Sequence, residues 1–254
     1  MRIVLIGSGN VATHLGHALK KAGENIIQVW SRSMENASAL AFSIDAEPVD
    51  DLEQIDSTAD LYIISVIDDA IAQVSAKLPV QDKVVVHTSG STGMEVLNGV
   101  SAAIGVLYPL QTFSKSREVN MMEVPIAIEA NSEDVLAMLK KLASKLSGNV
   151  LMLDSIQRRA LHVSAVFACN FTNHLYALAA SLLERNNLDF ALIRPLISET
   201  AEKIQSYSPK DVQTGPAVRN DQQTMQKHVR LLEDDPELRE IYEKLSQSIV
   251  NLHK

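Results

Sequence analysis

The sequence predicts an α/β domain with a doubly wound, mainly parallel sheet, followed by an all-α domain. Up to Asp154, short apolar runs alternate with helical segments, which is typical of parallel strands joined by crossover helices. From Ser155 onward no strand pattern remains, and the apolar residues follow helical spacing. We therefore expect two domains, residues 1–154 and residues 155–254.

The expected strands are apolar runs that end at glycine, polar or turn residues. In chain order they are residues 2–6, 26–30, 61–67, 83–87, 103–107, 125–128 and 149–153. Helical spacing predicts helices at residues 11–19, 37–42 and 133–146 in the first domain. In the second domain it predicts helices at residues 155–186, 194–206, 222–232 and 236–252, separated near Pro209, Pro216 and Pro236.

Composition and charge exclude several classes of protein. The 254 residues include 31 acidic and 23 basic side chains, a net charge of −8, which argues against non-specific binding of nucleic acid or anionic membrane. The whole acidic surplus falls in residues 1–154. A single cysteine, Cys169, excludes an intramolecular disulfide framework. With no signal-peptide pattern at the start, we expect a cytoplasmic protein.

One apolar segment has the length of a membrane span. Residues 160–183 contain no Asp, Glu, Lys or Arg, but they include His162, Asn170, Asn173 and His174, and polar groups are costly in lipid. We expect a helix buried between other helices or subunits instead. Because three short helices give it little cover, we expect a homodimer formed through the helical domain.

A glycine motif follows the first strand. Gly7, Ser8, Gly9, Asn10, Val11 and Ala12 spell G-x-G-x-x-A at the start of the first helix. In a βαβ unit this motif makes a tight turn and lets the backbone approach a pyrophosphate at a helix N-terminus. The first domain is therefore expected to be a Rossmann-type dinucleotide-binding domain, with Gly7, Ser8, Gly9, Asn10 and Val11 at the cofactor.

The end of the second strand predicts which dinucleotide binds. An NAD site usually has Asp or Glu here, whereas this chain has Ser31, Arg32 and Ser33. The Arg32 guanidinium suits a 2′-phosphate, so we expect NADP (NADPH) rather than NAD. A solvated surface arginine is the alternative.

Further cofactor contacts are expected where the third and fourth strands end. Val66 and Ile67 follow one strand, and Thr88 and Ser89 follow the other. Loops at these carboxyl ends line the ligand crevice of such folds. Ordinary turn chemistry explains these residues equally well.

Several segments resemble known families. GSGNVA, WSRS, SVIDDAI and the long helix resemble the 6-phosphogluconate dehydrogenase-like superfamily, which includes pyrroline-5-carboxylate reductase and the β-hydroxyacid dehydrogenases. Residues 108–113 (YPLQTF), 162–174 and 215–221 (GPAVRND) more closely resemble a bacterial family that joins a Rossmann-like domain to a helical domain of unknown function. Its members are labelled NADP oxidoreductases. The resemblance covers essentially the whole chain.

Two departures affect the chemistry that this resemblance implies. The β-hydroxyacid dehydrogenases have a catalytic Lys four residues before an Asn on the long helix; Asn170 resembles that Asn, but Val166 occupies the Lys position. Relatives in the bacterial family often have His where this chain has Tyr108. A phenol, with a pKa near ~10, is a poorer proton shuttle at neutral pH than imidazole.

The substrate site has candidates on the helical segments. For His162 and Asn170, a role in a catalytic pocket and a hydrogen-bonded helix contact are equally supported. Asn173 is a substrate candidate, although contacts at a dimer interface are the interpretation we favour for Asn173 and His174. Arg219 fits an anionic substrate group or a loop contact, and Asp221 fits a substrate role or the N-cap of the next helix.

The sequence thus predicts an NADP-dependent oxidoreductase that acts on a small carbonyl, imine or hydroxy compound. Asn170 and Arg219 would orient the substrate, with His162 or Tyr108 as proton donor. No metal-ligand spacing is present, and hydride transfer does not need one. The alternative is a non-catalytic NADP-binding regulatory or sensor protein, which the absence of the helix Lys favours.

Overall fold

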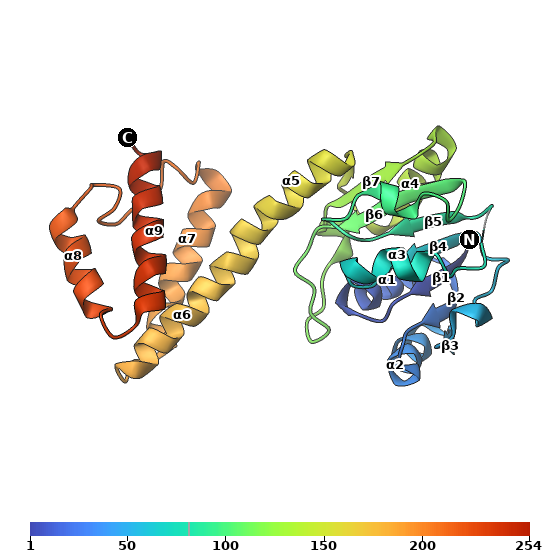
Figure 1. Cartoon of the computed structure of the whole chain (residues 1–254), viewed down its shortest axis with the longest axis horizontal. Helices are drawn as coiled ribbons and strands as arrows, with labels where there is room; N and C mark the ends of the chain where they lie inside the picture. Colours follow the sequence, from blue (N-terminus) through green and yellow to red (C-terminus); the bar gives the residue numbers. More distant parts are fainter. Residues whose placement is uncertain (81) are drawn as a thin grey trace. The chain divides into compact units, whose positions relative to one another are not determined.

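The first part of the chain forms an eight-stranded sheet in the residues that the structure describes (Figure 1). The structure is a computed structural model, and it describes residues 1–80 and 82–254. The strands are β1 (Arg2–Ile6), β2 (Asn25–Trp30), β3 (Glu47–Val49), β4 (Leu61–Ile64), β5 (Val84–His87), β6 (Ala103–Pro109), β7 (Ile126–Ala130) and β8 (Val150–Met152).

The strand order sets where a ligand can bind. The order is β3-β2-β1-β4-β5-β6-β7-β8, and every neighbouring pair is parallel except β6 and β7. The chain winds in one direction from β1 to β3 and in the other from β4 to β6. Crossovers from β1 and β4 therefore leave on opposite sides, and a crevice opens outside their carboxyl ends.

Helices cover both faces of the sheet. The helices of this part are α1 (Asn10–Lys21), α2 (Met34–Ile44), α3 (Ile71–Ser75) and α4 (Glu133–Leu146). Apolar side chains of α1, α2 and α4 pack on one face around residues such as Leu5, Ile63 and Leu107. On the other face, α3 and the turns near Ile55 and Leu97 pack on Val4, Ile64 and their neighbours. The two buried clusters hold the strand ends rigidly.

The rest of the chain is helical. Its helices are α5 (Ser155–Ala165), α6 (Thr172–Arg185), α7 (Arg194–Ser206), α8 (Gln222–Leu231) and α9 (Pro236–Leu252), and a π-helical turn (Val166–Phe171) joins α5 to α6. Ala217, Met225 and Val250 form a small buried cluster between α8 and α9. Arg185 at the end of α6 pairs with Asp235, the N-cap of α9, at 2.9 Å.

The compact units divide later than the point where strands give way to helices. One unit comprises Met1–Cys169 and the other Asn170–Lys254. The first turns of α5 therefore belong with the sheet, because Arg158 on α5 is buried against residues of β7 and of the loop after β5. The sequence pattern at Asp154 marks the end of the strands and contains no signal for this packing.

Most expected elements are present, and the differences have local causes. The expected strand at residues 61–67 ends at Ile64, and residues 65–67 lead from it into a 3-10 turn at Asp68–Ala70. The helix expected at residues 155–186 contains the π-helical turn and ends at Arg185. Both β3, which has only three residues, and α3, which has five, were too short for a periodic pattern to reveal.

The long helix is not buried within a single chain. Ser155–Arg185 is long and apolar enough to cross a membrane by length and composition alone, which is weak evidence for a span. The sequence predicted a helix covered by other helices or subunits, yet side chains such as Val163, 53 % exposed, lie open within this chain.

Candidate functional site

The glycine turn after β1 has the geometry that the motif predicts. Gly7 adopts φ +123°, and a Cβ there would lie 2.1 Å from the Ser65 carbonyl oxygen, so only glycine fits. A Cβ on Gly9 would meet no atom within 4 Å, which leaves open space before α1. No side chain caps α1, so its first amide groups are available to an anion. These features fit a dinucleotide pyrophosphate.

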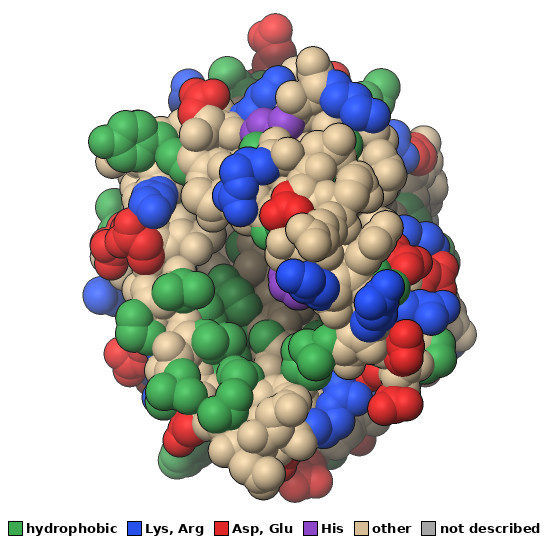
Figure 2. All heavy atoms as spheres, turned by 90° about the vertical axis from the view of Figure 1, so that its left-hand side faces the viewer, with side chains coloured by type: hydrophobic (Ala, Val, Ile, Leu, Met, Phe, Trp, Pro, Cys, Tyr) green, Lys and Arg blue, Asp and Glu red, His purple; other side chains and the backbone are tan. Residues whose placement is uncertain are grey.

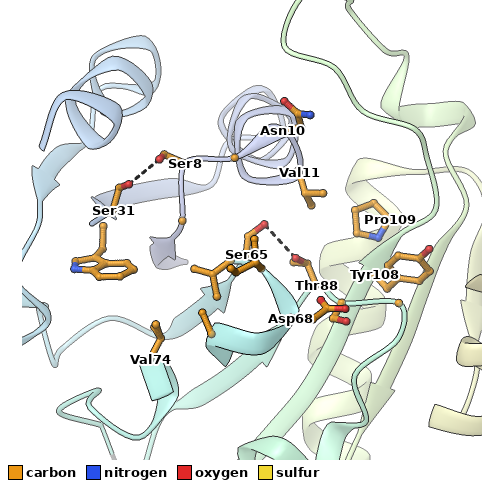
Figure 3. Close-up of a pocket in the computed structure, with 18 of the residues that line it drawn as sticks. Ser8, Asn10, Val11, Ser31, Ser65, Asp68, Val74, Thr88, Tyr108 and Pro109 are labelled. Carbon is orange, nitrogen blue, oxygen red and sulfur yellow. Dashed lines mark hydrogen bonds between the residues drawn. The ribbon is translucent and has the colours of Figure 1, made fainter. Parts of the chain in front are cut away.

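A cavity of about 740 Å³ extends from this turn across the ends of the strands. Its walls come from the glycine turn, from the ends of β2, β4, β5 and β6, and from α5 (Figure 3). The predicted residues that line it are Gly7, Ser8, Gly9, Asn10, Val11, Ser31, Arg32, Val66, Ile67, Thr88, Ser89, Tyr108 and His162. The cavity is built from the first unit, and its volume lies in the usual range for a bound cofactor.

The end of the cavity at β2 carries a positive charge. Arg32 is exposed and makes no hydrogen bond or ion pair within residues 1–80 and 82–254. Ser8 donates a hydrogen bond to the Ser31 hydroxyl at 2.9 Å, which joins the glycine turn to this end (Figure 3). Ser33 is half-buried and instead caps α2 by accepting from the Asn36 N–H. With a guanidinium and hydroxyls here, this end suits a 2′-phosphate.

The strand ends at the middle of the cavity are tied together. Thr88 donates to the Ser65 hydroxyl at 3.1 Å, which links the end of β5 to that of β4 (Figure 3). Ser89 accepts from the backbone N–H groups of Ser91 and Thr92 at 3.2 and 2.9 Å. Ile67 is 67 % exposed, so it stands at the rim of the cavity as a large apolar side chain in solvent.

A tyrosine and a histidine form a pair at the far end of the cavity. The Tyr108 hydroxyl lies 2.9 Å from Nδ1 of His162, and the two rings meet edge to face. A Cβ on Gly90 would lie 2.6 Å from the Tyr108 ring and 2.7 Å from His162 Nδ1, so the absence of a side chain makes room for the pair. Burial raises the pKa of Tyr108 to about 12, which keeps the phenol protonated.

A buried ion pair lies behind the loop that follows β5. Arg158 on α5, 1 % exposed, pairs with Glu129 of β7 and donates to the carbonyls of Thr92 and Ser89, the latter at 3.2 Å. Glu129 also accepts from the Ser155 hydroxyl at 2.8 Å. The loop that carries Thr88 and Ser89 is therefore fastened to the first turns of α5, on which His162 lies.

The remaining predicted residues belong to the second unit. Asn170, Asn173 and Arg219 are all exposed, and Asn170 lies in the π-helical turn. Asp221 caps α8, accepting from the Thr224 N–H at 3.0 Å and from its hydroxyl at 2.7 Å. These hydrogen bonds lower the pKa of Asp221, as expected for a helix cap. The N-cap role of Asp221 is thus present, and the substrate roles of the other three stay predictions.

Sequence reasoning missed several lining residues. They are Trp30, Asn36, Ser65, Asp68, Ala70, Val74, Gly90, Pro109, Gln111 and Lys115. Trp30, Ser65 and Asp68 lie at or beside the expected strand ends, so extending those predictions by a residue or two would have found them. Others, such as Asn36 and Val74, lie on helices that follow the strands. Lys115 lies in the long loop after β6, two residues beyond the segment 108–113, and nothing in its sequence marks it as a lining residue. The Arg158–Glu129 pair had no signal either, because β7 and α5 are separated in the sequence.

The chain matches two described families. Residues 2–90 match the family described as "NADP oxidoreductase coenzyme F420-dependent", and residues 124–249 match a domain of unknown function, DUF2520. No protein with a curated description matches the chain. Together the two matches cover both the sheet and the helical segments.

Solved structures resemble the chain over its whole length. A Bacteroides fragilis protein, provisionally described as an NADP oxidoreductase, is 48 % identical over 98 % of both chains, with a TM-score of 0.93. A pyrroline-5-carboxylate reductase from Streptococcus pyogenes is 13 % identical over 99 % of this chain and 98 % of its own, with a TM-score of 0.65. An imine reductase from Myxococcus stipitatus, solved with NADP+, is 17 % identical over 99 % of this chain and 92 % of its own, with a TM-score of 0.63.

The two reductases show a shared fold alone, whereas the Bacteroides protein is similar enough to show kinship. The fold expected from the sequence is confirmed, and so is the resemblance to NADP oxidoreductases. The chain belongs to the family of NADP oxidoreductases in which a domain of the F420-dependent type is followed by the DUF2520 domain.

Proposed function

We propose that this chain transfers a hydride between NADP(H) and a small carbonyl, imine or hydroxy compound. The observation that carries the proposal is one continuous cavity. It joins the glycine turn and Arg32, which suit the phosphates of the cofactor, to the Tyr108–His162 pair, which can move a proton. A dinucleotide laid along it would have its adenosine end at Arg32 and its nicotinamide end near Tyr108.

The division of labour follows from what each part of the site can do. Bound NADPH supplies the hydride. Reduction of a carbonyl or imine also needs a proton at the oxygen or nitrogen, and the Tyr108 hydroxyl can donate one while His162 shares it through their hydrogen bond. The fold shared with an imine reductase solved with NADP+ supports an imine as one substrate class.

The experiment measures turnover. The chain is incubated with NADPH and a panel of aldehydes, imines, keto acids and a deazaflavin, and oxidation is followed by the absorbance of the reduced nicotinamide. We expect one class to be reduced far faster than the rest. Tight NADPH binding with no turnover across the panel would favour a regulatory or sensor protein, the reading that Val166 at the Lys position favours.

The helical unit is proposed to form a homodimer. Leu192, Leu196 and Ile204, on or near α7, are 64 %, 70 % and 46 % exposed. Figure 2, which looks at the helical unit, shows hydrophobic side chains gathered on one side of the visible surface. Exposed apolar area of this kind marks an interaction site. The proposed partner is a second copy of the chain, in the cytoplasm. We also propose that Asn170, Asn173 and Arg219 of the helical unit bind the substrate.

A further inference from the structure

The loop after β6 is fastened onto the start of α1. This loop, residues 110–120, connects β6 to a 3-10 turn (Met121–Glu123). Asn10, the first residue of α1, donates from Nδ2 to the Phe113 carbonyl at 3.0 Å, and in Figure 3 its side chain points toward this loop. His14, one turn later, donates from Nε2 to the Ser114 carbonyl at 2.9 Å, and its ring stacks on Phe113 with centroids 4.8 Å apart.

These contacts bring a cation to the cavity. Lys115 follows Ser114 directly and lines the cavity together with the glycine turn. It is exposed, and its ammonium makes no hydrogen bond or ion pair in residues 1–80 and 82–254. Consecutive Cα atoms are ~3.8 Å apart, so the bonds to Asn10 and His14 hold Lys115 within side-chain reach of the first turn of α1.

The charges around the cavity limit what this lysine can bind. Among the described lining residues, Arg32 and Lys115 are the two basic side chains, and Asp68 is the acidic one. Arg32 stands at the end of β2, where a 2′-phosphate would lie. Lys115 instead follows the two residues bonded to Asn10 and His14, within side-chain reach of the N-terminus of α1, where the amide groups favour a diphosphate.

We infer that Lys115 is a ligand of the cofactor diphosphate, held in place by the docking of residues 110–120 onto Asn10 and His14. The inference rests on the proposed function, because it needs the dinucleotide in this cavity. It has a distinctive consequence. NADPH and NADH share the diphosphate but differ at the 2′-phosphate, so Lys115 affects both cofactors equally, whereas Arg32 affects NADPH alone.

The test compares dissociation constants of NADPH and NADH by calorimetry. Lys115→Gln is expected to raise both constants by the same factor, about 2- to 5-fold, which is the upper part of the range for a solvent-exposed charge contact. Lys115→Arg should restore most of the affinity. Arg117→Gln is the matched control: Arg117 lies on the same loop but lines a separate hollow beside α1, which Lys115 also borders. The control should change neither constant.

A second variant tests the docking of the loop. His14 does not line the cavity among the described residues, so His14→Ala removes no direct contact there and is expected to act on the cofactor through the loop. We expect it to weaken both cofactors by no more than Lys115→Gln does, and the two changes together to be no worse than Lys115→Gln alone. Additive losses would show that His14 and Lys115 act separately, which overturns the docking role.

Three results would overturn the assignment of Lys115. The first is unchanged binding in Lys115→Gln, which would indicate that the side chain points into the separate hollow that Arg117 lines. The second is a loss of affinity confined to NADPH. The third is an equal loss of affinity in Arg117→Gln, which would indicate that the positive charge of the loop acts at long range and not through a contact of Lys115. If the unmodified chain bound neither cofactor, the proposed function itself would fail together with this inference. Binding by the unmodified chain separates the two failures.

Discussion

At the residue scale, the choice between NADPH and NADH depends on the side chain of Arg32. Arg32→Ala should weaken NADPH by about 1.5–3 kcal/mol and leave NADH nearly unchanged, because only NADPH offers a 2′-phosphate to the guanidinium. Paired titrations of the two cofactors measure this difference. Equal losses for both would instead make Arg32 a general surface charge.

Tyr108 is the second residue with a specific expected effect. With the best substrate from the panel, Tyr108→Phe should lower kcat about 10²-fold or more while the dissociation constant of NADPH stays the same, because the change removes only the hydroxyl. His162→Ala distinguishes donor from partner: a larger loss than in Tyr108→Phe would assign the proton to the imidazole. Full kcat in Tyr108→Phe would remove the pair from the chemistry.

The buried side chain of His87 makes the stability of the fold depend on pH. It is completely buried at the end of β5, Nδ1 accepts the Ser89 N–H at 3.1 Å, and burial lowers its pKa to about 4 from 6.5. Between these values the unfolded chain binds the proton more readily than the folded one. This contribution to stability is therefore complete above pH 6.5 and falls by about 3 kcal/mol as the pH drops toward 4.

Denaturant unfolding at several pH values checks this prediction. His87→Gln should lower stability at neutral pH but flatten the pH dependence across this window, since the titrating group is gone. If the free energy of unfolding of His87→Gln depended on pH as steeply as that of the unmodified chain, another titrating group would be responsible for the pH dependence. His17, an exposed histidine of α1, gives the matched control as His17→Gln, which should leave the slope unchanged.

At the element scale, Arg158 fastens helix α5 to the loop after β5 and to Glu129 of β7. Arg158→Met leaves the Glu129 carboxylate, whose side chain is 15 % exposed, without its charged partner, so it should lower the free energy of unfolding by about 3 kcal/mol. Adding Glu129→Met should recover part of that loss, because two apolar side chains replace two charges. Thermal unfolding measures both variants. A loss in the double variant as large as in Arg158→Met would contradict the pairing.

The elements differ in how far the sequence predicts them. The helices Glu133–Leu146, Arg194–Ser206 and Pro236–Leu252 have the predicted bounds, since each has an apolar stripe and a clear end signal. The π-helical turn at Val166–Phe171 was not predicted, because nothing in a run of apolar residues distinguishes it from α-helix. The element at residues 110–120 could not be placed, since its docking depends on contacts with α1 far away in the sequence.

The residues of the site also differ in how far the sequence predicts them. Residues next to strand ends, such as Ser8, Thr88 and Ser89, could be predicted because the fold itself gathers the carboxyl ends of parallel strands. Tyr108 and His162 were predicted individually, but their hydrogen bond required the packing of α5 on β6. Lys115 was missed because a lysine in a long loop carries no information about where the loop lies.

The whole molecule is expected to be a dimer. The chain should sediment as a dimer at micromolar concentration, because apolar side chains on α7 such as Leu196 are open within one chain. Leu196→Glu should shift the species toward monomer, and Glu199→Gln, at an exposed residue of the same helix, serves as the control. A monomeric unmodified chain would refute the dimer.

The net charge of −8 also acts at this scale. Its surplus lies in residues 1–154, which contain the cavity, so the long-range field of the chain does not favour an anionic cofactor. Binding must depend on local groups: the N-terminus of α1, Arg32 and Lys115. This is the reason that single basic side chains are expected to have large effects here.

One measurement tests the central claim, that this cavity holds NADP, most directly. The unmodified chain is titrated with NADPH and with NADH under the same conditions by calorimetry. The structure predicts that NADPH binds at least about tenfold more tightly than NADH, since the 2′-phosphate meets Arg32. Binding of neither cofactor, or equal or tighter binding of NADH, would contradict it.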